Sequence, residues 1–145
     1  MRVLIQRVSK GSVSVDDKTI AQIGHGYIIL LGIYENDTEK DIDKLVPKVA
    51  NLRIMGDEEQ KMNKSILDTK GEIIVVSQFT LCADTRKGRR PSFIKAMHPD
   101  KAKELYKRFI TKLQDRNIVV KTGKFGGYMQ VEIINDGPTT ILLES

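Results

Sequence analysis

The longest apolar run in the chain extends from Tyr27 to Ile33, and it is interrupted by Gly32. A membrane-spanning helix needs roughly 20 consecutive apolar residues, so this chain is not expected to cross a membrane. A short apolar run bounded by turn residues is typical of a strand whose two faces are both covered. The stretch from Glu72 to Leu81 is rich in Ile and Val and predicts a second strand. The fold therefore needs a sheet in its interior.

Two helices are predicted from the spacing of apolar residues. The first follows a capping box formed by Thr38 and Asp41 and continues through Ile42, Leu45, Val46 and Val49. Pro47 lies within it, and proline removes one helical hydrogen bond and clashes with the preceding turn. We therefore expect a kinked helix or a later start. The second helix covers Pro99 to Gln114, where one stripe is formed by Ala102, Leu105, Tyr106, Phe109, Ile110 and Leu113.

Alternating apolar and polar residues predict shorter strands at 2–8, 13–15, 19–23, 52–55, 118–122, 128–134 and 139–143. Asn135-Asp136-Gly137-Pro138 is typical of a hairpin turn and is expected to join the last two strands. The order of elements indicates a compact α/β fold, with residues 1–145 forming a single domain. We expect a largely antiparallel, barrel-like sheet with the two main helices packed on one side.

Composition limits the possible partners and the compartment. The N-terminus shows no secretory signal, and the single Cys82 cannot form an internal disulfide, so a reducing, cytoplasmic location is expected. The formal net charge is +5. A basic chain favours a polyanionic partner such as nucleic acid, although a solvated basic surface explains the charge equally well.

Several kinds of chemistry have no support in the sequence. Only His25 and His98 are present, and neither lies in a metal-ligand pattern. No phosphate-binding loop, dinucleotide fingerprint or nucleophile elbow occurs, so neither a metal nor a cofactor is expected. His25 is interpreted as a turn residue, His98 as a helix-start residue and Cys82 as an inert core thiol.

Polar residues follow the most apolar strand. Ser77, Gln78 and Thr80 could orient an ester or a water molecule, but they could also form the polar face of an ordinary strand. In a regular strand Ser77 and Phe79 point one way and Gln78 and Thr80 the other, so all four can line one pocket only if the strand breaks.

Two further segments allow both a binding and a structural interpretation. Phe125 and Met129 flank a glycine-rich backbone where a base could stack, or where ordinary packing occurs. The basic loop, with Arg86, Lys87, Arg89 and Arg90, could contact phosphates or simply be solvated.

Taken in order along nearly the whole chain, these segments resemble the D-aminoacyl-tRNA deacylases. The most specific motifs are Ser77-Gln78-Phe79-Thr80-Leu81 and Asn135-Asp136-Gly137-Pro138-Thr139. The resemblance is supported by Lys61-Met62-Asn63, Ala83-Asp84-Thr85, Lys87-Gly88, Arg90-Pro91-Ser92-Phe93 and Phe125-Gly126. The sequence departs from the family pattern at Gly11, Pro47, Lys64 and Gly127.

The resemblance implies an editing hydrolase without a cofactor. Its substrates would be D-aminoacyl-tRNA and glycyl-tRNA-Ala, with neither DNA nor a membrane as a partner. It also implies a homodimer in which a cis Gly137-Pro138 motif reaches the partner's site and excludes L-amino acids by steric clash. A non-catalytic, dimeric RNA-binding protein is the alternative from another class, and a deacylase with relaxed chirality is a third.

The resemblance also assigns roles to residues. Arg7 would hold the Gly-Pro motif, and Phe125 and Met129 would flank the terminal adenine. Ser77 and Gln78 would position the substrate. Because no histidine base lies near Thr80 in the sequence, assistance from the 2′-hydroxyl of the tRNA fits better than a Thr80 nucleophile. The backbone N–H of Phe79 is then the candidate oxyanion donor.

Overall fold

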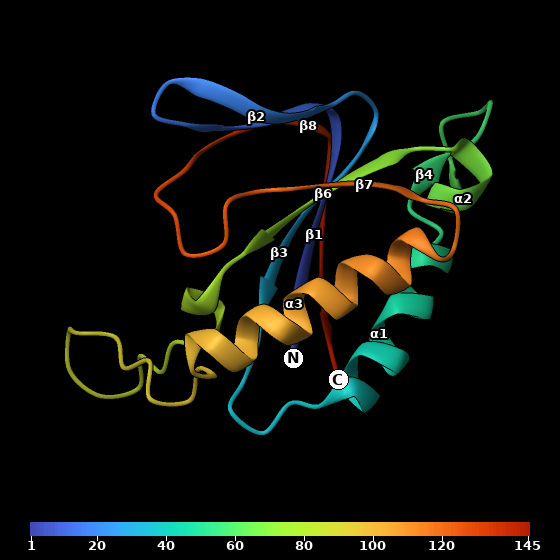
Figure 1. Cartoon of the computed structure of the whole chain (residues 1–145). Coiled ribbons are helices and arrows are strands. Elements are labelled where there is room, and N and C mark those ends of the chain that lie inside the picture. The colour runs from blue at the N-terminus through green and yellow to red at the C-terminus, as the bar shows by residue number, and fades with distance from the viewer.

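The computed structural model describes all 145 residues and contains eight strands, two long helices, one short helix and one 3-10 helix (Figure 1). The strands are β1 (Arg2–Val15), β2 (Lys18–Ile23), β3 (Gly26–Gly32), β4 (Met55–Gly56), β5 (Met62–Lys64), β6 (Glu72–Ser77), β7 (Val119–Thr122) and β8 (Gln130–Glu144). The helices are α1 (Glu39–Asn51), α2 (Ile66–Thr69), the 3-10 helix η1 (Phe79–Cys82) and α3 (Pro99–Gln114).

The main sheet has the order β2-β1-β3-β6-β7, and β8 pairs with β1. The pairs of β1 with β2, β3 and β8 are antiparallel, whereas β3–β6 and β6–β7 are parallel. The sheet curls so that its first and last strands in this order, β2 and β7, approach each other. Lys121 Nζ on β7 donates a hydrogen bond to the carbonyl oxygen of Gln22 on β2 at 2.6 Å. The expected barrel-like α/β fold is therefore confirmed.

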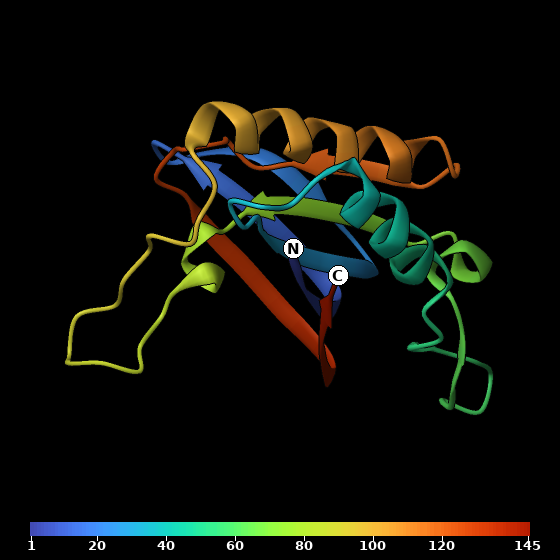
Figure 2. The ribbon, with the colours of Figure 1, turned by 90° about the horizontal axis from the view of Figure 1, so that it is seen from below.

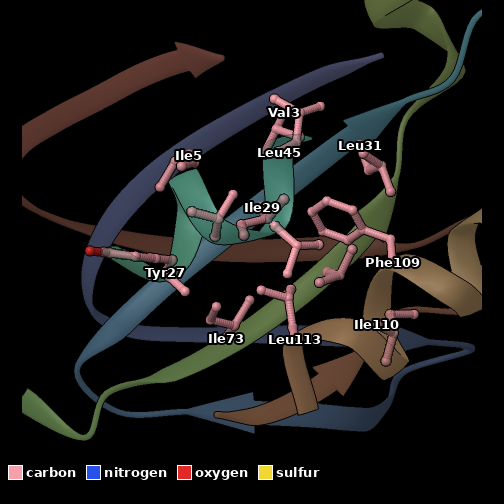
Figure 3. Packing of buried hydrophobic residues seen from close by; sticks show 14 of the residues in the cluster. Val3, Ile5, Tyr27, Ile29, Leu31, Leu45, Ile73, Phe109, Ile110 and Leu113 are labelled. Atoms are coloured by element: carbon pink, nitrogen blue, oxygen red, sulfur yellow. The ribbon is translucent and has the colours of Figure 1, made fainter. Parts of the chain in front are cut away.

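The two central strands are covered on both faces, as their apolar sequences predict. Ile29 and Ile73 belong to the large core on the helix side (Figure 3), whereas Ile28 and Ile74 belong to a smaller core enclosed by the curled part of the sheet. All four side chains have no exposed surface. This alternation follows from the strand period of two, which sends successive side chains to opposite faces.

Helices α1 and α3 lie on the same side of the sheet (Figure 2). The capping box of Thr38 and Asp41 is present, and the α1 helix begins directly after it, so the later start is not observed. Pro47 is accommodated inside the helix. The apolar stripe of α3 faces the sheet, and the Tyr106 hydroxyl donates a hydrogen bond to the Val75 carbonyl of β6 at 2.7 Å. Burial raises the pKa of Tyr106 to about 12.

The prediction of a C-terminal hairpin turn at residues 135–138 is wrong. Residues 130–144 form the single strand β8, and both of its halves pair with β1. The register shifts twice, between Gln6 and Val8 and between Val8 and Lys10. The turn-forming residues therefore make an irregularity in one strand. The physical reason is that β1 is itself one strand, continuous from residue 2 to 15, and offers a partner along its whole length.

Other boundaries also differ from the sequence prediction. The strand expected at Glu72–Leu81 ends at Ser77, and the chain continues as η1. The short strand expected at 52–55 is replaced by Met55–Gly56, which pairs with Met62–Lys64. The pairing of β4 with β5 and the four-residue helix α2 were not predicted. No helix is long and apolar enough to cross a membrane.

The close approach of β3 to β6 yields a stability prediction. A Cβ added at Gly26 would lie 1.9 Å from the Glu72 carbonyl oxygen, whereas one added at Gly24 would meet nothing within 4 Å. Because backbone atoms cannot move aside as a flexible side chain can, Gly26→Ala is expected to lower the free energy of unfolding by at least about 2 kcal/mol. Gly24→Ala, the matched control, should stay within about 0.5 kcal/mol of wild type in urea unfolding. Equal midpoints for the two variants would contradict this close approach of the two strands.

Candidate active site

The polar motif at the end of β6 lies where the strand stops. Ser77 pairs with Leu31 of β3, and the Gln78 N–H donates to the Leu31 carbonyl at 2.8 Å. Gln78 has φ −140° and ψ 77°, after which the chain enters η1. The break lifts the restriction that a regular strand would impose on the directions of these side chains.

Helix η1 packs directly against the end of β3. A Cβ added at Gly32 would lie 2.8 Å from Leu81 Cβ and 3.2 Å from the Gln78 carbonyl oxygen. Gly32 therefore leaves the space that η1 occupies. The Met97 N–H also donates to the Ile33 carbonyl at 3.0 Å, which holds the start of α3 beside the same strand end.

A cavity of about 640 Å³ opens at this edge of the sheet. It brings Ser77, Gln78 and Phe79 together with Phe125 and Met129, which the sequence placed in separate segments. Its volume is in the range of small-molecule sites, and most of its wall is apolar. The wall also includes residues that sequence reasoning did not assign to a site, among them Leu31, Ile33, Phe93, Ala96, Met97, His98, Pro99, Ala102 and Tyr128.

The far wall of the cavity is the loop between β7 and β8. The ring of Phe125 packs against Tyr106 of α3, with centroids 5.4 Å apart. The sulfur of Met129 accepts a hydrogen bond from the Lys124 N–H at 3.2 Å and occupies the space that a side chain at Gly123 would need. Phe125 and Met129 are therefore held by packing and also line the cavity. This segment is compatible with both earlier interpretations, ordinary packing and a surface where a base could stack.

Thr80 does not line the cavity. Its hydroxyl accepts a hydrogen bond from the Gln78 side-chain amide, and the residue is exposed. The N–H groups that begin a helical turn have no acceptor within that turn, so η1 itself supplies no acceptor for the Phe79 N–H. His98 is the histidine in the cavity wall, and it precedes α3 as a helix-start residue.

Cys82 is buried at the end of η1. Burial raises the pKa of its thiol, which disfavours the thiolate needed for nucleophilic attack. The interpretation as a core thiol agrees with this environment. No cluster of three or more His, Cys, Asp or Glu side chains that could hold a metal ion is found.

The Gly137-Pro138 motif is organised by Arg7. The guanidinium donates from Nε to the Asp136 carbonyl at 3.0 Å and from NH1 to the Ile54 carbonyl at 2.6 Å. Nε also lies 3.1 Å from the Asp136 carboxylate. The Gly137-Pro138 peptide is cis, and Gly137 has φ +123°, a conformation that favours glycine.

Arg7, which holds the Gly137-Pro138 motif, and the cavity lie at different positions along the strands of the sheet. Arg7 pairs with Tyr27 at the beginning of β3, whereas Ser77 pairs with Leu31 near its end. Four residues of strand separate these levels, which corresponds to roughly 13 Å. Gly137 and Pro138 are exposed and do not line the cavity of their own chain.

The basic loop extends away from the sheet and helices (Figure 1). It is closed at its base by hydrogen bonds between Asp84 and Ser92. Arg86 donates from Nε to the Asp84 carboxylate at 2.9 Å and holds the pKa of that carboxyl well below its usual value. Lys87, Arg89 and Arg90 are exposed and form no ion pair within the chain. The loop thus contains one compensated and three uncompensated cations.

Comparison with known proteins agrees with this geometry. Residues 4–144 match the D-Tyr-tRNA(Tyr) deacylase family. The chain is 54% identical over 145 residues to a D-aminoacyl-tRNA deacylase of Shouchella clausii, covering 100% of this chain and 99% of the relative. It is 50% identical over 145 residues to a D-aminoacyl-tRNA deacylase of Clostridioides difficile, covering 100% and 97%.

Two solved structures have the same fold. One is described as c-Myc DNA Unwinding Element Binding Protein, with a TM-score of 0.94, 45% identity and coverage of 100% of this chain and 99% of that chain. The other is described as a probable eukaryotic D-amino acid tRNA deacylase, with a TM-score of 0.87, 19% identity and coverage of 99% and 98%. The family match over almost the whole chain, together with these full-length relatives, favours an enzyme over a non-catalytic RNA-binding protein. The chain belongs to the D-aminoacyl-tRNA deacylase family and is a hydrolase that acts on D-aminoacyl-tRNA.

Proposed function

We propose that residues 1–145 act as one cytoplasmic editing domain that hydrolyses the ester between a D-amino acid and the terminal adenosine of tRNA. The observation that carries the proposal is the cavity in which Ser77, Gln78 and Phe79 face Phe125 and Met129. The terminal adenine occupies the apolar side formed by Phe125 and Met129. The ester lies beside the end of β6, where Ser77 and Gln78 position it.

In the proposed reaction, water attacks the carbonyl carbon of the ester. Negative charge develops on the carbonyl oxygen, and the Phe79 N–H donates a hydrogen bond to it. The bond from the carbonyl carbon to the ribose 3′-oxygen then breaks. That oxygen leaves as a hydroxyl, with the neighbouring 2′-hydroxyl of the tRNA assisting the proton transfer. This route needs neither a histidine base nor a Thr80 nucleophile.

We further propose that the enzyme is a homodimer and that the Gly137-Pro138 motif enters the partner's cavity. Two features support this arrangement: the motif is exposed, and it is separated from the cavity of its own chain by roughly 13 Å of strand. Carbonyl groups aimed at the substrate's α-carbon exclude an L side chain and leave a D side chain free. Glycine has no side chain to exclude, so glycyl-tRNA-Ala is also a substrate.

The first test concerns Thr80. Because its hydroxyl is turned to Gln78 and lies outside the cavity wall, Thr80→Ala should keep kcat within about tenfold of wild type, whereas loss of a true nucleophile costs orders of magnitude more. Single-turnover deacylation of D-Tyr-tRNA measures this. A collapse to the uncatalysed rate in a folded variant that still binds substrate would restore Thr80 as the nucleophile.

The basic loop provides a second test through the salt dependence of KM. Removing two phosphate contacts with Arg89→Ala/Arg90→Ala should reduce the slope of log KM against log salt by about 1.4 to 1.8. Arg86→Ala is the matched control, since Asp84 already compensates that charge, and its slope should change less. An unchanged slope in the double variant would remove this loop from the tRNA-binding surface.

Chirality provides the third test. Arg7→Ala removes the two donors that hold the Asp136 and Ile54 carbonyls, so the motif loses its fixed direction. The ratio of D-Tyr-tRNA to L-Tyr-tRNA hydrolysis should fall at least about tenfold, equivalent to the lower end of one charge-assisted hydrogen bond. Lys10→Ala, on the same strand, removes only an exposed ion pair with Glu132 and serves as the control. If the ratio is unchanged in a folded, dimeric Arg7→Ala variant, chirality is set elsewhere.

A further inference from the structure

Tyr128 is an aromatic residue exposed at the rim of the cavity. Its exposed fraction is 92%, the highest among the large hydrophobic residues, and it nevertheless forms part of the cavity wall. It makes no hydrogen bond or aromatic contact within the chain. A single exposed apolar residue needs no explanation, but an aromatic ring at the mouth of a binding site does.

The loop that carries Tyr128 is built so that this ring points outward. Phe125 packs inward on Tyr106, and the Met129 sulfur is held by the Lys124 N–H. Between them, the Gly127 N–H donates to the Lys124 carbonyl at 3.0 Å, and Gly126 has φ +71°. Because Phe125 and Met129 are both fixed inward, Tyr128 is the ring that the loop exposes to solvent.

The other two exposed rings at the cavity already pack against each other. Phe79 is 55% exposed and Phe93 37%, and their edge-on contact has a centroid distance of 5.1 Å. The face of Tyr128 has no such partner. Lys124, in the same loop, forms no ion pair within the chain, and its side chain lies against Gly127. The rim at Tyr128 therefore combines a free aromatic face with a free cation.

The exposed Tyr128 ring and the Lys124 cation suit the penultimate nucleotide of the tRNA substrate. A cavity of about 640 Å³ is the size of a site for one small molecule, here the aminoacyl-adenosine. The nucleotide attached to that adenosine then lies outside the cavity, at its rim. Proteins hold single-stranded nucleic acid by stacking bases on aromatic rings and placing cations near the phosphates. We propose that Tyr128 is the stacking platform for the base of the penultimate nucleotide of the tRNA, an inference that rests on the proposed function.

The test compares two substrates that differ only beyond the terminal nucleoside. Stacking on an aromatic ring contributes about 1–3 kcal/mol per base, so Tyr128→Ala should lower kcat/KM for D-Tyr-tRNA by about 5- to 150-fold. Hydrolysis of D-tyrosyl-adenosine, which has no penultimate base, should fall by a much smaller factor, because the substitution then removes only wall contacts. Tyr128→Phe retains the ring and should restore the wild-type value for both substrates.

A D-Tyr-tRNA with an abasic penultimate nucleotide completes a double-mutant cycle. Wild type should lose about as much kcat/KM on this substrate as Tyr128→Ala loses on the intact one, and combining both changes should add no further loss. Additive losses, or an equal effect of Tyr128→Ala on D-tyrosyl-adenosine, would overturn the proposal. So would a changed oligomeric state of Tyr128→Ala in light scattering, because the ring would then belong to an interface between chains. If wild type hydrolyses neither substrate, the proposed function itself fails.

Discussion

The parallel pairing of β3 with β6 is the constraint on which the site depends. Parallel strands end at the same edge of a sheet, so Leu31 and Ser77 stand side by side and both chain segments must leave the sheet there. The chain after β6 forms η1, and the chain after β3 leads toward α1. The hydrogen bond from Met97 to Ile33 brings the start of α3 to the same edge. A cavity at this place follows from topology, and the side chains around it determine what it binds.

The cavity and the segment held by Arg7 lie at opposite ends of the strands of the main sheet. At the carboxyl ends of β3 and β6 lies a cavity with a mostly apolar wall, to which we assign the nucleoside. The opposite end carries Arg7, whose Nε donates to the carbonyl that precedes the exposed Gly137-Pro138 segment. His98 lies in the cavity wall, but the proposed reaction does not use it as a base. An aminoacyl ester is already activated, and the proposed reaction therefore relies on positioning and on a stabilised oxyanion.

Much of the fold was accessible from the sequence because local patterns coincide with packing. Periodicity predicts the α3 stripe, residue types predict the capping box at Thr38, and a continuous apolar run predicts the buried strand at 27–33, which is found at 26–32. The segment Asn135–Pro138 misled because its residues favour turns, while the long partner strand β1 outweighed that local preference. The end of β6 at Ser77 was not predicted. Met97, His98 and Tyr128 were not predicted as site residues, since only the tertiary fold brings them to the cavity.

Gly32 shows how a site can depend on an atom that is missing. The 3-10 helix η1 and the Gln78 that precedes it pack on this residue, and a Cβ there would meet Leu81 and the Gln78 carbonyl. The polar motif can therefore be intact in a sequence whose pocket no longer forms. Among distant sequences, a glycine at the end of the third strand is then a marker of a working pocket that is independent of the signature residues. A larger residue at that position would require η1 to move, even in a protein that shares the whole architecture.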